Sequence, residues 1–204
     1  NAMNKQLMDE LLDAIRRHRD NQHVRAMIIS GEGSSFMAGA DVVEYSEADT
    51  TEFRRFQQQG HELYRLLEEA PFPVIAAVRG YALGGGFEIA LACDFIVAEP
   101  EAKLGLPEVR LGLVPGGGGT QRLLEKIGSP RATMMLLLGE SFNASTLEAW
   151  GIVSLISEDP VAAADALAER LMRRPAAAVA SAKWLLKVAA RPGDLSARLF
   201  AEEQ

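Results

Sequence analysis

The amino-acid sequence predicts an α/β fold with a largely parallel sheet. Three short apolar runs, at residues 24–30, 74–78 and 95–98, have the length and composition of buried strands. Segments with helical periodicity separate these runs, and alternation of strands with helices is typical of this fold class. With 204 residues, of which 48% are hydrophobic and 24% charged, the chain is long enough for one domain with its own core.

The helices are predicted from apolar residues at helical spacing and from the residues that interrupt them. In the N-terminal half they are expected at about 4–19, 51–70 and 85–92. Pro71 and Pro73 end the second of these. The remaining helices are expected at about 119–127, 130–138, 145–150, 160–173 and 175–190, with a short strand at 153–156 and the start of another helix at 194–204. We therefore expect a single domain over 1–204, with a helical subdomain from about residue 130.

Charge and composition argue against several function classes. The net charge is −7 and the pI about 5.1, whereas a nucleic-acid-binding protein usually carries a basic stripe. No apolar run reaches about 18 residues, so no membrane-spanning helix is expected. The single cysteine, Cys93, lies in an apolar run and is expected to be buried, in keeping with a reducing, cytoplasmic location. The histidines are scattered, and no metal site is expected.

The segment 73–88 joins a buried strand to a helix through a glycine-rich turn, Gly84-Gly85-Gly86. Unpaired N–H groups and the positive end of the macrodipole meet at a helix start, and glycines let a ligand oxygen approach them. The pattern favours a site for an anion or oxyanion over a turn that needs glycine for packing alone. Glu88 follows in the first turn, where the dipole alone would also favour an acidic residue.

Two further segments have similar features. Ala38-Gly39-Ala40-Asp41 is a loop of small residues after the first strand, where open α/β sheets bind ligands, although Asp41 could equally cap the next segment. Glu108 follows a proline in an apolar stretch, and burial there would raise its pKa and suit it to a general acid. A surface glutamate is the alternative. Four glycines, Gly116 to Gly119, then precede another helix.

The glycine clusters do not match known nucleotide-binding motifs. A dinucleotide fingerprint starting at Gly84 or Gly116 would need a third glycine where Ile89 or Gln121 stands. The P-loop requires Gly-Lys, which the sequence lacks.

Taken together, the segments A-G-A-D, G-Y-A-L-G-G-G-F-E, L-P-E and P-G-G-G-G-T-Q-R-L resemble, in this order, the enoyl-CoA hydratase/isomerase (crotonase) superfamily. The resemblance covers nearly all of residues 1–190. It implies repeated ββα units and a C-terminal helical region that assembles trimers or hexamers. Relative to the family, an opening strand pair and the closing helices are missing from the chain.

The resemblance also implies a site. The backbone N–H groups of Ala40 and Gly85 would form an oxyanion hole for a thioester carbonyl. Glu88 would help to activate a water molecule that adds at C3, and Glu108 would exchange a proton with C2. Ala38, Asp41, Gly84 and Gly116 would contact substrate, and the acyl pocket would be lined from segments 41–70 and 110–140.

Because the chain has both glutamates, the resemblance favours syn hydration of a trans-2-enoyl-CoA to a 3-hydroxyacyl-CoA. No cofactor is implied besides the coenzyme A thioester, which is the substrate. Alternatives are a Δ3-Δ2-enoyl-CoA isomerase, a decarboxylase or a hydrolase on the same scaffold. Outside these activities, an RNA-binding relative or a scaffold whose glycine loops serve only packing remain to be considered.

Overall fold

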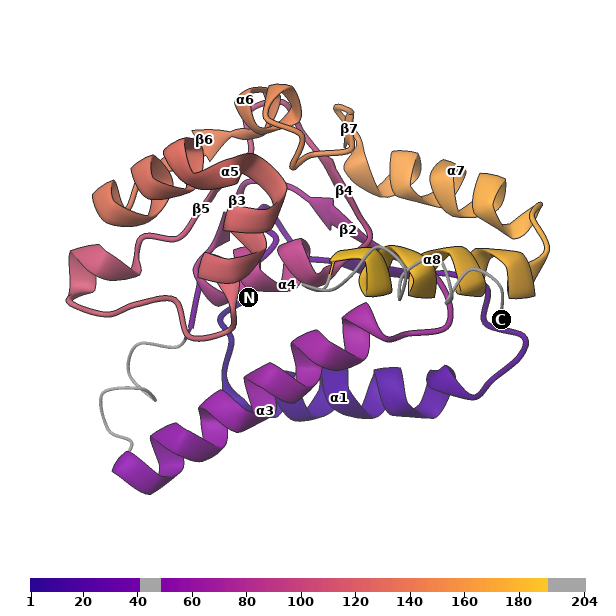
Figure 1. Ribbon diagram of the computed structural model, residues 1–204, viewed down its shortest axis with the longest axis horizontal. Coiled ribbons are helices and arrows are strands. Elements are labelled where there is room, and N and C mark those ends of the chain that lie inside the picture. The colour runs from indigo at the N-terminus through magenta and orange to yellow at the C-terminus, as the bar shows by residue number, and fades with distance from the viewer. Residues whose placement is uncertain (41–48, 191–204) are drawn as a thin grey trace.

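The computed structural model describes residues 1–40 and 49–190, the last three by their backbone alone, and confirms the α/β class (Figure 1). Four strands form a parallel sheet in the order β1–β2–β4–β7. A second sheet has the order β3–β5–β6, in which β3 and β5 are parallel and β5 and β6 antiparallel. The strands are β1 Met27–Ser30, β2 Val74–Val78, β3 Tyr81–Leu83, β4 Phe95–Ala98, β5 Lys103–Gly105, β6 Ser141–Asn143 and β7 Leu155–Ile156.

The helices agree closely with those expected from the sequence. They are α1 Lys5–Arg19, α3 Thr50–Glu68, α4 Gly85–Ala92, α5 Gly119–Leu138, α6 Ala144–Ala149, α7 Pro160–Met172 and α8 Ala176–Ala190, with a 3-10 helix η1 at Glu108–Leu111. The break expected between residues 127 and 130 lies inside α5, where Gly128 has a non-helical backbone with φ of 72° and Pro130 follows. Proline cannot continue the hydrogen-bonding pattern of the preceding turn, so the two halves of α5 meet at a kink.

The sequence did not predict β3, β5, β6 or η1. Each strand among them has three residues, too few for a periodic pattern, and each is defined by a partner distant in the chain. The strand expected at 24–30 is limited to 27–30, and that expected at 153–156 to 155–156. With β3 and β5 included, the order β2–β3–α4 and β4–β5–α5 forms two ββα units.

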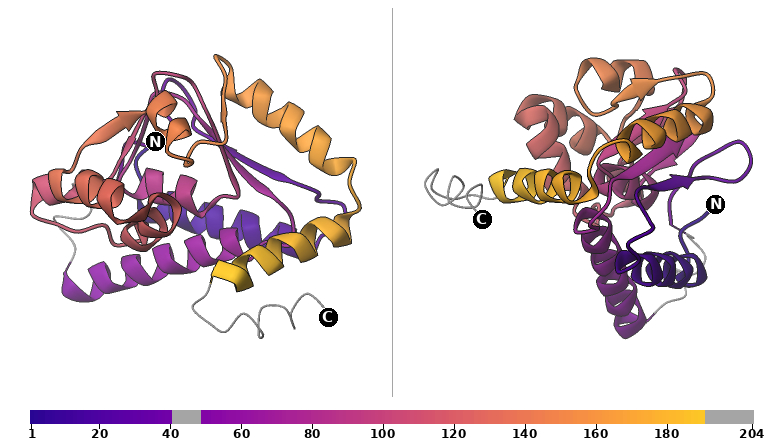
Figure 2. Two further views of the ribbon diagram at one scale, coloured as in Figure 1. Left: turned by 45° about the horizontal axis from the view of Figure 1, so that its top comes forward. Right: turned by 90° about the vertical axis from the view of Figure 1, so that its right-hand side faces the viewer.

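Helices cover both faces of the four-stranded sheet (Figure 2). On one face Ile75, Ala77 and Val97 pack against Ala164 and Ala168 of α7. The other face belongs to the main core, which includes buried residues of α1, α3 and α4. All five residues of β2 are buried, as expected for a parallel strand with a layer on each side.

Local capping fixes where α1 and α3 begin. The side chain of Asn4 accepts a hydrogen bond from the Leu7 N–H at 2.9 Å. At α3, Asp49 and Glu52 form a reciprocal capping box, in which each side chain accepts from the backbone N–H of the other residue. α1 and α3 pack side by side along the lower edge of the molecule in Figure 1.

The region after residue 130 is connected to both sheets, because β6 pairs with β5 and β7 pairs with β4. The helical trimerisation subdomain expected there stays a prediction. Cys93 is buried, as expected, and burial raises the pKa of its thiol to about 12. Within residues 1–40 and 49–190, no helix combines the length and apolar character needed to cross a membrane.

Candidate active site

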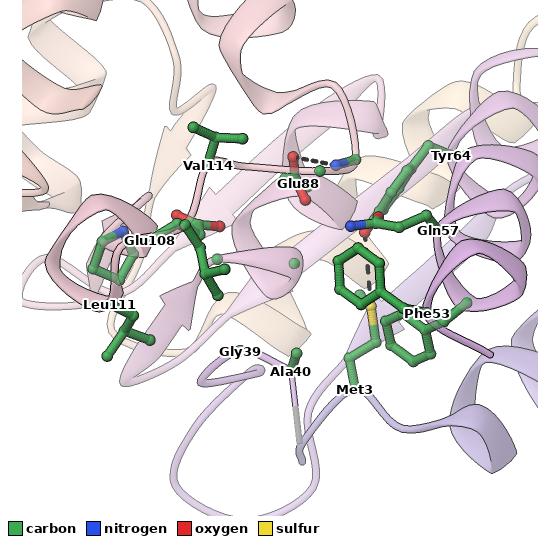
Figure 3. Close-up of a pocket in the computed structure, with 18 of the residues that line it drawn as sticks. Met3, Gly39, Ala40, Phe53, Gln57, Tyr64, Glu88, Glu108, Leu111 and Val114 are labelled. Carbon is green, nitrogen blue, oxygen red and sulfur yellow. Dashed lines mark hydrogen bonds between the residues drawn. The ribbon is translucent and has the colours of Figure 1, made fainter. Parts of the chain in front are cut away.

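The residues singled out in the sequence meet at one cavity of about 190 Å³ (Figure 3). It lies where the starts of α4 and α5, the helix η1 and the N-terminal half of α3 come together. Its lining includes the expected site residues Ala38, Ala40, Gly84, Gly85, Glu88, Glu108 and Gly116. Asp41, the remaining one, lies outside the described residues.

The parallel pairing of β3 with β5 explains how Gly84 and Glu108 meet. The two strands run in register, Leu83 beside Gly105, and the Gly84 N–H donates to the Gly105 carbonyl at 3.0 Å. The chain therefore leaves both strands at the same edge of the sheet, where β3 leads into α4 and β5 leads into η1. This is the carboxyl edge, at which parallel sheets place their ligands.

At each of the three glycines at the start of α4, a side chain would meet a different neighbour. Gly84 has φ of +53°, and a Cβ there would lie 3.2 Å from Glu108 Oε1. A Cβ on Gly85 would lie 2.8 Å from Met3 Cε, and one on Gly86 would collide with the Met37 carbonyl oxygen. The glycines thus bring the 37–40 segment and Glu108 directly against the helix start, in addition to forming the turn.

Ala40 and Gly85 both line the cavity. Leu83 N–H donates to the Met37 carbonyl, and Met3 N–H donates to the Gly39 carbonyl, which together hold the 37–40 segment beside β3. Gly85 is the first residue of α4, so its N–H has no acceptor within the helix, and the N-cap Gly84 has no side chain to supply one. The arrangement fits an oxyanion hole.

Glu88 is anchored by the glycine-rich loop before α5. Its side chain is 3% exposed, and Oε1 accepts two hydrogen bonds of 2.8 Å, from the N–H groups of Gly117 and Gly119. Gly119 is the first residue of α5, so Glu88 acts as the cap that this helix lacks in its own sequence. Burial raises the pKa of Glu88, while these two amides and the charge of Arg122 offset part of the shift.

Glu108 has a different environment on the opposite side of the cavity (Figure 3). Its Oε2 atom is buried and has no hydrogen-bond partner in the described part of the chain. Burial raises the pKa of Glu108 to about 7, and the neighbouring charge of Glu88 adds to the shift. The expectation that an apolar setting would raise this pKa is confirmed. A carboxyl with such a pKa holds or releases a proton near neutral pH.

Arg122, which the sequence reading did not single out, supports the loop that anchors Glu88. Its Nη1 donates to the Gly117 carbonyl and its Nε pairs with Glu68 Oε1 at 2.7 Å. The guanidinium also lies over the Tyr64 ring, 5.4 Å from the ring centre. Arg122 therefore connects α3 to Gly117, the residue whose own N–H binds Glu88.

The walls of the cavity come from the two segments expected to line an acyl pocket. From α3, Phe53, Phe56, Gln57, Gly60 and Tyr64 recur at helical spacing on one face. The facing wall comes from Leu111, Leu113 and Val114, whose side chains are largely exposed to the cavity mouth and solvent. The periodicity of α3 was visible in the sequence, but the neighbour that its face would meet was not.

Within residues 1–40 and 49–190, no three His, Cys, Asp or Glu side chains lie together in a way that could hold a metal ion. The polar groups of the residues that line the cavity include the carboxyl groups of Glu88 and Glu108, the amide of Gln57, the hydroxyl of Tyr64 and backbone amides.

Comparisons with known proteins agree with this geometry. A family model described as enoyl-CoA hydratase/isomerase matches residues 1–204. The chain is 43% identical over 157 residues to the crotonyl-CoA hydratase of Syntrophomonas wolfei, covering 76% of this chain and 60% of that protein. It is 37% identical over 189 residues to the 2,3-dehydroadipyl-CoA hydratase of Escherichia coli, covering 92% of this chain and 73% of that protein.

Among solved structures, that of an enoyl-CoA hydratase from Bacillus anthracis superposes with a TM-score of 0.95 at 33% identity, covering 100% of this chain and 80% of the other. The chain thus spans between about three fifths and four fifths of the length of these proteins. With the family model matching end to end and the fold shared throughout, the chain belongs to the enoyl-CoA hydratase/isomerase family.

Proposed function

We propose that the protein is an enoyl-CoA hydratase, which adds water to a trans-2-enoyl-CoA and gives a 3-hydroxyacyl-CoA. The observation that carries the proposal is the pair of carboxyl groups in one cavity with unlike surroundings. Glu88 is held by two amide hydrogen bonds, whereas Glu108 has a buried oxygen that finds no hydrogen-bond partner among residues 1–40 and 49–190, and a pKa raised to about 7. Surroundings that act so differently on two carboxyl groups push their pKa values apart. The group with the lower pKa then suits the role of base, and the group with the higher pKa suits the role of acid.

The reaction follows from these assignments. With the thioester oxygen at the Ala40 and Gly85 amides, the C2–C3 double bond lies between the two glutamates. Glu88 removes a proton from water, the oxygen bonds to C3, and the electron pair moves to the thioester oxygen as an enolate. Glu108 then gives its proton to C2. A preorganised amide donor at such an oxygen contributes about 3–4 kcal/mol to the barrier reduction in other enzymes.

The glycine-rich loops give substrate access to these groups. Ala38, Gly84 and Gly116 line the same cavity as Glu88 and Glu108, which supports their proposed roles in substrate contact. The substrate role of Asp41 rests on the family pattern alone. The mechanism requires no cofactor, because thioester, water and the two glutamates supply every atom and proton transferred.

The experiment is a comparison of Glu88→Gln with Glu108→Gln in the full-length protein, with crotonyl-CoA as substrate. A hydratase loses about 10²–10⁴-fold in kcat with either change, since each glutamate performs a separate proton transfer. Hydration that survives either substitution unchanged contradicts the mechanism.

Double-bond isomerisation is a second candidate, favoured by the properties of Glu108 alone. A single carboxyl with a pKa of about 7, one oxygen of which has no hydrogen-bond partner in the described part of the chain, suits the shuttling of a proton between C2 and C4. In that case Glu88→Gln retains isomerisation of a 3-enoyl-CoA, while Glu108→Gln abolishes it. Measuring both reactions on the same two variants separates the activities.

The assembly and location of the whole protein are proposals of the same kind. We propose a homotrimer or a dimer of trimers acting in the cytoplasm in acyl-CoA metabolism. Family membership supports these proposals, and sedimentation of the full-length protein tests the assembly.

A further inference from the structure

The acyl wall of the cavity combines apolar side chains with one neutral amide, Gln57. This residue lies on α3 between Phe53 and Tyr64, and Figure 3 shows it pointing from the helix into the space that Glu88 also faces. A Cβ on Gly116 would lie 2.6 Å from Gln57 Oε1, so the amide lies directly against the loop before α5. The side chain therefore borders the region through which an acyl chain would leave C3.

The charged side chains among the described residues that line the cavity are all acidic. Glu88 and Glu108 line it, whereas no lysine, arginine or histidine is among the described residues that do. Arg122, close behind the wall, is engaged by Glu68 and by the Gly117 carbonyl. The positive ends of α4 and α5 are used by the proposed oxyanion and by Glu88 Oε1.

An acyl chain with a second carboxylate would consequently enter a cavity that holds negative charge and in which residues 1–40 and 49–190 place no cationic side chain on the lining. We infer that the site selects enoyl groups that are uncharged beyond the thioester, and that position 57 determines this selectivity through its neutral side chain. The inference rests on the proposed hydratase function and specifies its substrate class. Two like charges about 10 Å apart at the edge of a protein disfavour each other by roughly tenfold in an equilibrium.

The test uses two substrates of equal carbon number. Hex-2-enoyl-CoA is neutral beyond the thioester, and 2,3-dehydroadipyl-CoA has a terminal carboxylate. We expect kcat/KM of the unmodified protein to favour the neutral substrate by at least about tenfold. Gln57→Lys should reduce this ratio by about tenfold, because the ammonium group faces the added carboxylate. Gln57→Met, of similar length and without charge, should leave the ratio near its original value.

Binding provides a readout that does not depend on turnover. Hexanoyl-CoA and adipyl-CoA do not react, and the ratio of their inhibition constants measures the same selectivity as the ratio of kcat/KM values. If Gln57→Lys has lost activity, calorimetry measures the dissociation constants of the two analogues instead. Equal use of both substrates by the unmodified protein overturns the inference, as does a ratio that Gln57→Lys leaves unchanged in both kinetics and binding. Failure to hydrate either substrate instead contradicts the proposed function.

Discussion

Glu88 has two separable tasks, one structural and one chemical, which a pair of substitutions can distinguish. Its Oε1 accepts the N–H groups of Gly117 and Gly119 at 2.8 Å each in a site that is 3% exposed. In Glu88→Gln a carbonyl oxygen remains to accept both hydrogen bonds. In Glu88→Ala both N–H groups lose their acceptor.

The structure gives the expected size of the difference in stability. A buried N–H without a partner costs about 1–3 kcal/mol, so two of them cost about 2–6 kcal/mol. Removing a buried carboxylate offsets part of this loss, since burial is what raises the pKa of Glu88. We expect Glu88→Ala to lower the free energy of unfolding by about 2–4 kcal/mol and Glu88→Gln by less than about 1.5 kcal/mol.

Activity should not follow stability. Both variants lack the base, so kcat for hydration falls by about 10²–10⁴-fold in each. Urea unfolding at matched protein concentration measures the free energy of unfolding. The decline in ultraviolet absorbance of the enoyl thioester measures kcat.

Two results would refute the reasoning. Equal destabilisation by alanine and glutamine would show that the amide hydrogen bonds do not anchor the loop before α5. A Glu88→Gln protein with kcat close to that of the unmodified protein would show that Glu88 is not the base.

Three further predictions concern pH, the glycine loop and the core. Glu108 must be protonated to give its proton to C2, and its pKa is about 7. We therefore expect kcat/KM for hydration to fall by about tenfold per pH unit above pH 7. A flat profile to pH 9 contradicts this. In Gly117→Ala the new Cβ would lie 2.5 Å from Glu88 Oε2 and would collide with the Tyr64 ring, so we expect kcat to fall at least about tenfold, with retained activity as the contrary result. Lys183 is 8% exposed and binds Asp94 Oδ2 at 2.6 Å, so Lys183→Met should lower the free energy of unfolding by about 3–5 kcal/mol. The control at a more accessible lysine, the half-buried Lys187→Met, should change it by less than about 1 kcal/mol, and equal effects in urea unfolding would exclude a special role for the buried pair.

The sequence by itself determined the fold class and most helices, because their signals are local. Buried parallel strands such as 74–78 are continuous apolar runs, and a helical face such as that of α3 repeats within a few turns. Glu88 and the glycines before it were also accessible from sequence, since the requirements of a helix start extend over only a few neighbouring residues.

Only the tertiary structure decided which residues meet. The three-residue strands β3 and β5 have no periodic signal of their own, yet their pairing places Gly84 beside Glu108 at one sheet edge. The raised pKa of Glu108, the two amides that hold Glu88 and the neutral amide of Gln57 in the acyl wall all depend on segments distant in the chain. Burial and hydrogen bonding are properties of a three-dimensional neighbourhood, and a linear pattern records them only where neighbours in space are also neighbours in sequence.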